Sequence, residues 1–372
     1  MNVLHVISSL RHGGAERLVT SLAPQLKARG IDVSVISLLD CTPLRGELID
    51  AGIPTTNLGH EGTIYSVPGM ARSFFRLRKA IAERSPDIIH SHLYLPDILS
   101  RLAAPRSCAL MTTLHGQDPW WREPYRWRSR GKRWLDRSTG LARQVRYISV
   151  SKQVYDVASE ALAIPSSKHR IIHNGINLSK FPAEQRQAHA RPIIVQVGRF
   201  YPEKGHMTSL KALAIARQSM PDLHLRLVGE GPLRKELEQE VVRLGLTTSV
   251  TFAGLRDDVQ AELASADIFW MPSEREGLPL ACVEAMASGL PVVASAVGGL
   301  PELIEHARSG ILVQAGAAQD LAKRTVELIE DRELAEHFSR NARATVERSF
   351  SLDMTVTRYE QAYRDLLQGR WS

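Results

Sequence analysis

Short apolar runs alternate with amphipathic stretches along most of the chain. In the first half, runs rich in β-branched residues lie at 3–8, 33–38, 88–91, 110–114, 147–150 and 170–172. Segments with a helical spacing of apolar positions separate them, for example 15–28, 69–83 and 153–162. Runs that are apolar throughout are typical of strands buried on both faces. Strands and helices in alternation predict a parallel sheet with right-handed crossovers.

This alternation stops once and then resumes. Residues 178–191 are polar, include Pro182 and show no clear period, which predicts a linker. A second series of runs lies at 193–197, 223–228, 250–252, 268–271, 292–295 and 311–313, and residues 332–367 are predicted to be wholly helical. With 372 residues the chain is long enough for two cores. We therefore predict two Rossmann-like, doubly wound α/β domains, with a first domain at 1–178, a linker at 179–191, a second domain at 192–350 and a C-terminal helix at 351–372 that packs back towards the first domain.

Composition narrows the class of protein. Hydrophobic residues make up 44% and charged residues 23%, which is typical of a folded protein. No run of about eighteen apolar residues is present, so we expect no membrane span. The first nine residues lack the features of a signal peptide, and the three cysteines are far apart without CxxC spacing. These features predict reduced thiols and a cytoplasmic protein.

The net charge of +7 is unevenly distributed. Residues 1–185 hold 25 basic against 15 acidic side chains, whereas the remainder holds 22 against 25. A basic first half predicts contact with something anionic, and nucleic acid, an anionic membrane or a phosphorylated acceptor would each fit.

Candidate binding residues follow the first run of each predicted domain, where open parallel sheets bind ligands. Gly13 and Gly14 open a helix after the first run, and helix N-termini favour anions; a plain tight turn is the alternative. In the second domain, Arg199 and Lys204 flank the equivalent loop. A guanidinium, an ammonium and helix-end amides can bind a diphosphate there, although exposed basic residues are more often simply solvated.

Two glutamates lie around one predicted helix start. Pro279 suits the first turn of a helix, which places Glu276 in the loop before it and Glu284 in the second turn. A carboxylate beside a helix start can accept hydrogen bonds from sugar hydroxyls, and one a turn further in can hold a diol such as ribose. Glu276 as a cap and Glu284 in solvent are the alternatives, but the residues around Glu284 are apolar on nearly all sides, so its carboxylate needs a partner.

Together these motifs resemble a known family. In chain order they are GGAE at 13–16, TLHG at 113–116, VS at 150–151, NGI at 174–176, GR at 198–199 with KG at 204–205, VGEGP at 228–232, Glu-x7-Glu at 276–284, PVVAS at 291–295 and GGLPE at 298–302. The series resembles the retaining glycosyltransferases of family 4 over nearly the whole chain, with the more specific motifs in the second half. The resemblance implies the GT-B fold, in which two Rossmann-like domains face each other across a cleft and C-terminal helices cross back.

The resemblance also implies a reaction. A hexose or N-acetylhexosamine moves from a nucleotide diphosphate sugar to a glycan, lipid-linked acceptor or polysaccharide precursor, with retention of configuration. The Glu276-Gly277-Leu278-Pro279 form resembles members that use UDP-sugars. No cofactor and no metal are expected, because basic side chains and helix dipoles supply the positive charge. The donor's own β-phosphate oxygen would take the proton from the acceptor hydroxyl.

Residue roles follow from the same resemblance. Arg199 and Lys204 bind the diphosphate, Glu276 contacts the transferred hexose, and His115 lies near the reacting centre. The remaining donor-binding positions are Gly13 and Gly14 over the phosphates, Glu284 at the ribose, Gly229, Glu230 and Arg256 near the base, and Gly277, Leu278, Pro279 and Leu280 around the sugar and diphosphate. Asp257 and Asp258 are expected to start a helix and not to bind a metal.

One segment of the first half combines aromatic and basic residues. Its candidate acceptor or membrane residues are Trp120, Trp121, Arg126, Trp127, Arg128, Lys132 and Arg133, and residues 72–79 have a similar character. Such a surface suits the anionic inner face of the cytoplasmic membrane and a lipid-diphosphate acceptor. The alternatives are tryptophans packed in the core, or a nucleic-acid surface, which would not need the donor site.

Three other functions remain open from the sequence. The chain could be a catalytically silent partner of an active transferase, could glycosylate a soluble small molecule, or could run another GT-B reaction such as epimerisation or phosphorolysis. The presence of His115, Arg199, Lys204, Glu276 and Glu284 favours an enzyme.

Overall fold

The computed structural model describes residues 1–39, 43–60, 66–116, 119–122, 127–182, 191–256 and 258–371. The chain divides into two compact units. The first unit consists of Met1–Asn174 with Leu352–Ser372, and the second unit is Gly175–Ser351. The end of the first domain was predicted at residue 178. Most of the expected linker, residues 183–190, lies outside the described residues.

The first unit is built on a seven-stranded parallel sheet in the order β3-β2-β1-β4-β5-β6-β7. The strands are β1 (Asn2–Ile7), β2 (Asp32–Leu39), β3 (Thr55–His60), β4 (Ile88–His92), β5 (Ala109–Leu114), β6 (Arg146–Ser149) and β7 (His169–Ile171). Strand β3 was not predicted, because it is an edge strand whose sequence TTNLGH holds a single large apolar residue.

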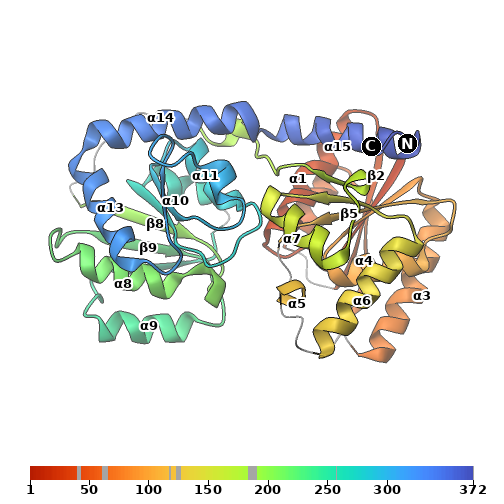
Figure 1. Cartoon of the computed structure of the whole chain (residues 1–372), viewed down its shortest axis with the longest axis horizontal. Helices are drawn as coiled ribbons and strands as arrows, with labels where there is room; N and C mark the ends of the chain where they lie inside the picture. Colours follow the sequence, from red (N-terminus) through yellow and green to blue (C-terminus); the bar gives the residue numbers. More distant parts are fainter. Residues whose placement is uncertain are drawn as a thin grey trace. The chain divides into compact units, whose positions relative to one another are not determined.

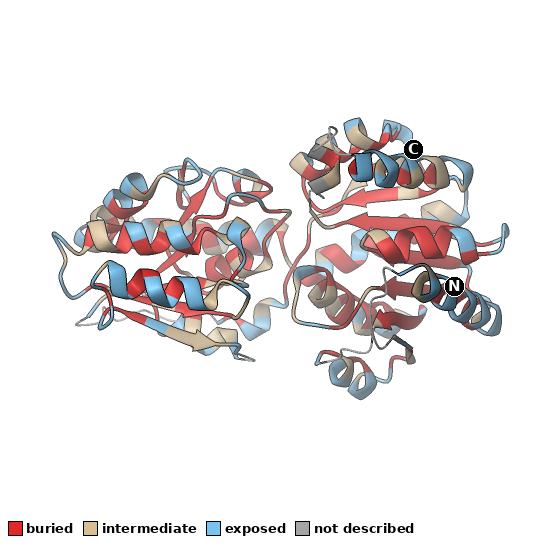
Figure 2. Cartoon of the chain, turned by 90° about the horizontal axis from the view of Figure 1, so that it is seen from below, coloured by how far each residue is buried: buried red, intermediate tan, exposed pale blue. Residues whose placement is uncertain are grey.

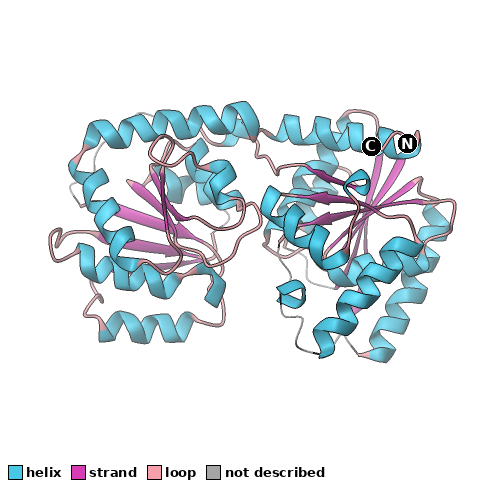
Figure 3. Ribbon diagram, in the orientation of Figure 1, coloured by secondary structure: helices cyan, strands magenta, loops and turns pink. Residues whose placement is uncertain are grey.

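Helices cover both faces of this sheet (Figures 1 and 3). The helical elements of the first unit are α1 (Gly14–Ala28), α2 (Arg45–Asp50), α3 (Val67–Arg84), α4 (Tyr94–Ala103), α5 (Pro119–Arg122), α6 (Trp127–Ala142), α7 (Lys152–Leu162), the 3-10 turn η1 (Ser166–Lys168) and α15 (Leu352–Leu367). Although α15 comes last in the chain, it buries Val356, Tyr359 and Tyr363 in the same apolar core as α1 and the strands. Arg170 at the sheet edge pairs with Asp365 of this helix at 2.7 Å.

The second unit repeats the plan with six parallel strands in the order β10-β9-β8-β11-β12-β13. They are β8 (Ile193–Val197), β9 (His224–Val228), β10 (Val250–Gly254), β11 (Ile268–Met271), β12 (Val292–Ser295) and β13 (Ile311–Val313). Its helical elements are η2 (Leu178–Lys180), η3 (Pro202–Lys204), α8 (His206–Ala216), α9 (Arg234–Arg243), α10 (Val259–Ala264), α11 (Leu280–Ala287), α12 (Leu300–Leu303), α13 (Ala318–Glu330) and α14 (Arg332–Ser349). Most strand residues of both sheets are buried, which agrees with their continuous apolar runs (Figure 2).

The helical stretch predicted over 332–367 is interrupted once, next to the domain boundary predicted at residue 350. Helix α14 ends at Ser349 and α15 begins at Leu352. Between them Ser351 forms a parallel bridge with Ile176, whose amide donates to the Phe350 carbonyl at 3.0 Å. This pairing takes two residues out of the helix, and it requires a contact between segments far apart in the sequence.

None of the helices in the described part of the chain is both long and apolar enough to cross a membrane.

Candidate functional site

Glycines pack the loops at the carboxyl edge of the second sheet tightly together. Gly205 has φ +69°, and a Cβ there would lie 1.9 Å from the carbonyl oxygen of Pro272. Gly229 has φ +142°, and its Cβ would lie 2.1 Å from the carbonyl oxygen of Gly198. Any larger residue would clash with backbone at both places. The glycines therefore hold the loops after β8, β9 and β11 against one another.

An ion pair joins two of these loops. Lys204 Nζ lies 2.7 Å from Oε1 and 2.8 Å from Oε2 of Glu276, and Ser273 Oγ donates to the same Oε1 at 2.7 Å. The Glu276 side chain is 5% exposed and that of Lys204 is 22% exposed. The two predicted residues thus meet as a partly buried pair, and Lys204 does not present a free charge. Ser273 is an addition that the sequence analysis did not assign.

The backbone around Glu276 is also tightly fixed. Gly298 has φ +61°, and its Cβ would lie 2.3 Å from the carbonyl oxygen of Glu276. The Gly299 amide donates to the Gly277 carbonyl at 2.6 Å, and the Glu274 amide donates to Glu203 at 2.8 Å. These contacts preorganise the carboxylate on a rigid loop.

Arg199 lies on the same edge, two residues after the end of β8, and is exposed. Its guanidinium sits over the Tyr201 ring, 4.9 Å from the centroid. Within the described part of the chain, the structure shows no ion pair for Arg199. Arg199 therefore presents a positive charge that is not neutralised by an ion pair among the described residues.

The start of α11 differs slightly from the prediction. Pro279 is the extended residue before the helix, with φ −75° and ψ 112°, and the helical residues begin at Leu280. Leu278 is buried and Gly277 is half-buried. Glu284 lies in the second turn, as predicted, and is half-buried among residues that are buried.

The residues predicted to line the base pocket are joined mainly through backbone. The Phe200 amide donates to the Glu230 carbonyl at 2.9 Å, and the Gly229 amide donates to Gly254 at 2.8 Å. The side chain of Glu230 pairs with Arg234 at 2.8 Å. Arg256 is exposed and pairs with Glu262 at 3.1 Å, so its guanidinium points along the surface of its own unit.

The acidic pair beside Arg256 is only partly described. Asp258 caps α10 by accepting from the Ala261 amide at 3.0 Å, which confirms its predicted place at a helix start. Asp257 lies outside the described residues.

Gly13, Gly14 and His115 belong to the first unit. Gly13 is the extended residue before α1, and a Cβ there would lie 2.4 Å from Glu16 Oε2. Glu16 also accepts from Ser9 Oγ at 3.4 Å. Gly14 has open space around it, so crowding alone does not require glycine at that position.

His115 directly follows β5 and is joined to further histidines. Its Nε2 lies 3.0 Å from Nδ1 of His92, and Nε2 of His92 lies 3.0 Å from Nδ1 of His5. His90, which is paired with His5 in the register of β4 and β1, is fully buried beside them. Burial lowers the pKa of His115 and of His5 to about 3. His115 is therefore a neutral imidazole at physiological pH and a weak base.

The three other histidines were not predicted as part of a site. Their signal was present, because His5 and His90 stand inside apolar runs predicted to be buried strands and His92 directly follows the second of these runs. Ring nitrogens of these three lie within 4.8 Å of one another, a spacing that one metal ion could bridge.

The aromatic and basic segment divides between core and surface. Trp121 is buried and Trp120 is half-buried, whereas Trp127 is 77% and Trp134 70% exposed. Packing in the core thus accounts for Trp121 only. Of the basic positions, Arg128 and Lys132 are exposed and Arg133 is half-buried, while Arg126 lies outside the described residues.

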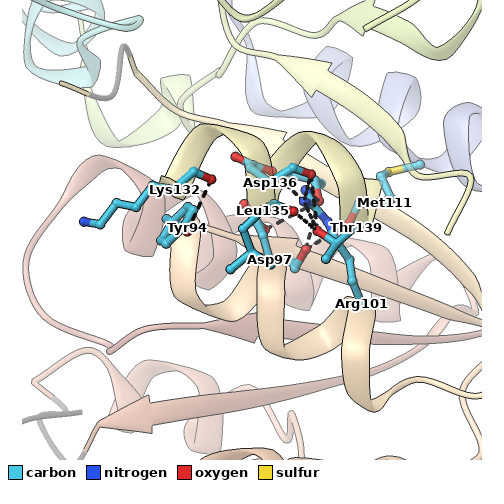
Figure 4. A network of polar contacts seen from close by, with 10 residues as sticks. Tyr94, Asp97, Arg101, Met111, Lys132, Leu135, Asp136 and Thr139 are labelled. Carbon is cyan, nitrogen blue, oxygen red and sulfur yellow. Dashed lines mark hydrogen bonds and ion pairs between the residues drawn. The ribbon is translucent and has the colours of Figure 1, made fainter. Parts of the chain in front are cut away.

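A buried polar network anchors α6, the helix that carries these exposed tryptophans (Figure 4). Arg101 of α4 pairs with Asp136 of α6 at 2.5 Å, and both side chains are less than 5% exposed. Arg101 also donates to the Thr139 hydroxyl at 3.3 Å. Lys132 Nζ lies 4.7 Å from the centroid of the Trp120 ring, outside this network. The buried side of α6 is therefore anchored to α4, which fixes the position of the side of α6 that carries the exposed tryptophans.

Comparison with solved structures gives the class of fold. HepE of Anabaena, solved in complex with UDP-glucose, superposes with a TM-score of 0.84 over 98% of this chain and all of that chain, at 22% identity. The two doubly wound units are those of the GT-B glycosyltransferase fold.

Comparison with families then places the chain. Residues 12–180 match the family model described as Glycosyltransferase Family 4, and residues 179–345 match the one described as Glycosyl transferases group 1. The chain belongs to glycosyltransferase family 4 and is a transferase, which confirms the resemblance drawn from its motifs.

Two curated relatives span most of its length. N-acetyl-alpha-D-glucosaminyl L-malate synthase of Bacillus anthracis is 27% identical over 96% of this chain and 95% of its own. UDP-Gal:alpha-D-GlcNAc-diphosphoundecaprenol alpha-1,3-galactosyltransferase of Escherichia coli is 24% identical over 80% of each.

Proposed function

We propose that this protein is a retaining, metal-independent transferase that moves a hexose or N-acetylhexosamine from a UDP-sugar to a lipid-linked or polysaccharide-precursor acceptor. The observation that carries the proposal is the Lys204–Glu276 pair at the carboxyl edge of the second sheet, with Arg199 exposed beside it. This is the edge at which open α/β sheets bind nucleotides.

The pair fits a diphosphate sugar because it offers both signs of charge at one point. The Arg199 guanidinium and the third N–H of the Lys204 ammonium, whose other contacts go to Glu276, bind the diphosphate and stabilise the departing UDP. The Glu276 carboxylate, held by Lys204 and Ser273, accepts hydrogen bonds from hydroxyls of the sugar. These cations take the electrostatic role that a divalent ion has in other transferases.

The uridine preference is supported by the relatives. HepE was solved with UDP-glucose, and the galactosyltransferase of Escherichia coli is named for UDP-Gal. The residues from Glu276 to Pro279 also resemble those of members that use UDP-sugars.

We propose retention without a base or nucleophile from the protein. Glu276 is engaged by two partners, and His115 has a pKa of about 3, so at neutral pH it does not take up a proton readily. The β-phosphate oxygen of the donor then takes the proton of the acceptor hydroxyl, on the face that UDP leaves.

The acceptor class is inferred from the surface of the first unit. Trp127 and Trp134 stand seven residues apart on α6, which is two turns and therefore one helix face. Helix α4 packs between α6 and α3, and α3 exposes Phe75 by 67%. Aromatic side chains among exposed basic residues suit the anionic headgroups of the inner leaflet, where a lipid-diphosphate acceptor resides. A soluble small-molecule acceptor, as in the malate synthase relative, would not require this surface.

The first experiment is a thermal-shift screen of nucleotides and nucleotide sugars, because a donor that binds the native state raises Tm. We expect UDP and UDP-sugars to stabilise the protein more than GDP-sugars. The donor that binds is then incubated with a diphospholipid-linked saccharide with and without EDTA, and the anomeric configuration of the product is read by NMR. Inversion, or loss of turnover with EDTA, would contradict the mechanism.

A further inference from the structure

A continuous chain of hydrogen bonds runs from His115 into the core of the first unit. From His115 it passes through His92 and His5, at 3.0 Å for each contact. His5 Nε2 lies 3.4 Å from the hydroxyl of Tyr363, which lies 2.7 Å from Nδ1 of His90.

Beyond His90 the chain ends on α15. His90 Nε2 lies 2.7 Å from Thr113 Oγ1, and Thr113 Oγ1 lies 3.1 Å from the hydroxyl of Tyr359. Tyr359 and Tyr363 stand one turn apart on α15, so one helix face supplies two members. All members except His115 are buried side chains of the core.

A neutral imidazole has one N–H donor and one bare acceptor nitrogen. A ring that accepts a hydrogen bond from one neighbour therefore donates to the neighbour on its other side. Burial lowers the pKa of His90 and His92 well below the usual range as well, so all four rings are neutral. The protons can then all point towards His115 or all towards Tyr359; a reversal at one of the hydroxyls, which can accept from both neighbours, would leave the proton of that hydroxyl unpaired.

The two directions differ in what they leave unpaired. If the protons point towards Tyr359, two groups are left unpaired. The O–H of Tyr359 has no acceptor among the described residues, and the lone pair on Nδ1 of His115 has no donor. If they point towards His115, every hydroxyl and ring nitrogen inside the chain is satisfied, and one N–H at Nδ1 of His115 remains. The second direction is favoured, because buried polar groups pair wherever they can.

We propose that this chain of hydrogen bonds fixes His115 as the neutral tautomer with its proton on Nδ1. Tyr363 and Tyr359 of the C-terminal helix are then positioning residues for that donor. The partner of this N–H must be an oxygen with a free lone pair; that it is a hydroxyl of the transferred sugar rests on the proposed function. All four histidines then carry the proton on Nδ1, the minor form of a free imidazole.

The tautomers are measured directly by NMR. Protein labelled with 15N-histidine is examined by long-range proton–nitrogen correlation at pH 7, and the signals are assigned through single His→Gln variants. We expect the Nδ1–H pattern for His5, His90, His92 and His115. The Nε2–H pattern at His115 would overturn the proposal.

Tyr363→Phe tests the positioning role, since it removes the hydroxyl that joins His5 to His90. We expect mixed tautomers at His5, His92 and His115, unchanged affinity for UDP, and kcat/KM for the UDP-sugar lowered by up to about tenfold, as for one lost hydrogen bond. Tyr147→Phe is the matched control, because Tyr147 is a buried tyrosine of β6 outside the chain. An unchanged tautomer pattern in Tyr363→Phe would refute the proposal that the chain of hydrogen bonds fixes the tautomer of His115.

Two further outcomes separate the alternatives. The purified protein could instead bind zinc stoichiometrically, with ring signals of His5, His90 and His92 that move on chelation. That result would show a metal centre and overturn the proposal that hydrogen bonds fix the tautomers. The predicted tautomers without transfer from any sugar nucleotide would support the assignment and overturn the proposed function.

Discussion

The Lys204–Glu276 pair gives the sharpest test of the site. In Lys204→Met the Glu276 carboxylate, 5% exposed, keeps only the Ser273 hydroxyl of its three described contacts. Breaking a buried pair costs about 3–5 kcal/mol. Lys204 is 22% exposed, so water can replace part of its interaction, and we expect a loss of about 2 kcal/mol.

That loss translates into a measurable shift. For a unit of this size, about 2 kcal/mol lowers Tm by roughly 4–8 °C, seen by calorimetry in the transition of the second unit. The double variant Lys204→Met with Glu276→Gln carries no unpaired charge and should recover most of this loss. Lys235→Met on the exposed face of α9 is the control for the substitution itself.

Activity should follow a different pattern. Both residues are proposed to contact the donor, so kcat/KM should fall by about 10²–10³ in Lys204→Met and no less in the double variant. Stability recovers in the double variant while turnover does not. A double variant with wild-type turnover would refute the donor-binding role, and one no more stable than Lys204→Met would refute the electrostatic account of the pair.

Three further predictions address packing, pH and membrane contact. Gly298→Ala places a Cβ 2.3 Å from the Glu276 carbonyl oxygen in a left-handed conformation, so it should lower both Tm and turnover, and normal values for both would contradict the rigid loop. Burial lowers the pKa of His115 to about 3 against about 6.5 when unfolded, so its contribution to stability is complete above pH 6.5 and falls by about 2 kcal/mol at pH 5. Urea unfolding of the wild type should therefore lose more stability between pH 7 and pH 5 than that of His115→Gln, and equal losses would count against it. The double variant Trp127→Ser with Trp134→Ser should sediment less with anionic liposomes but retain turnover of a soluble acceptor analogue, and equal sedimentation would exclude this face as the contact.

The two-unit architecture could be predicted from the amino-acid sequence alone. Apolar runs without alternation are a local property, and they marked all but one strand of the first sheet and all six of the second. The exception is β3, whose residues become a strand only through pairing with β2 at the edge. Gly205 and Gly229 were part of the motifs that carry the family resemblance, and the structure gives the reason for them, a close approach to neighbouring backbone.

Which charged side chains meet could be seen only in the folded structure. Nothing local in the sequence pairs Lys204 with Glu276, since the two loops come together through the neighbouring strands β8 and β11. The hydrogen-bond partners of His115 could not be read from the sequence either, because the chain of hydrogen bonds joins residues of β1, β4, β5 and α15. Periodicity reports how a segment is buried, whereas a hydrogen bond between distant segments depends on strand order and on helix packing, which the chain acquires only when it folds.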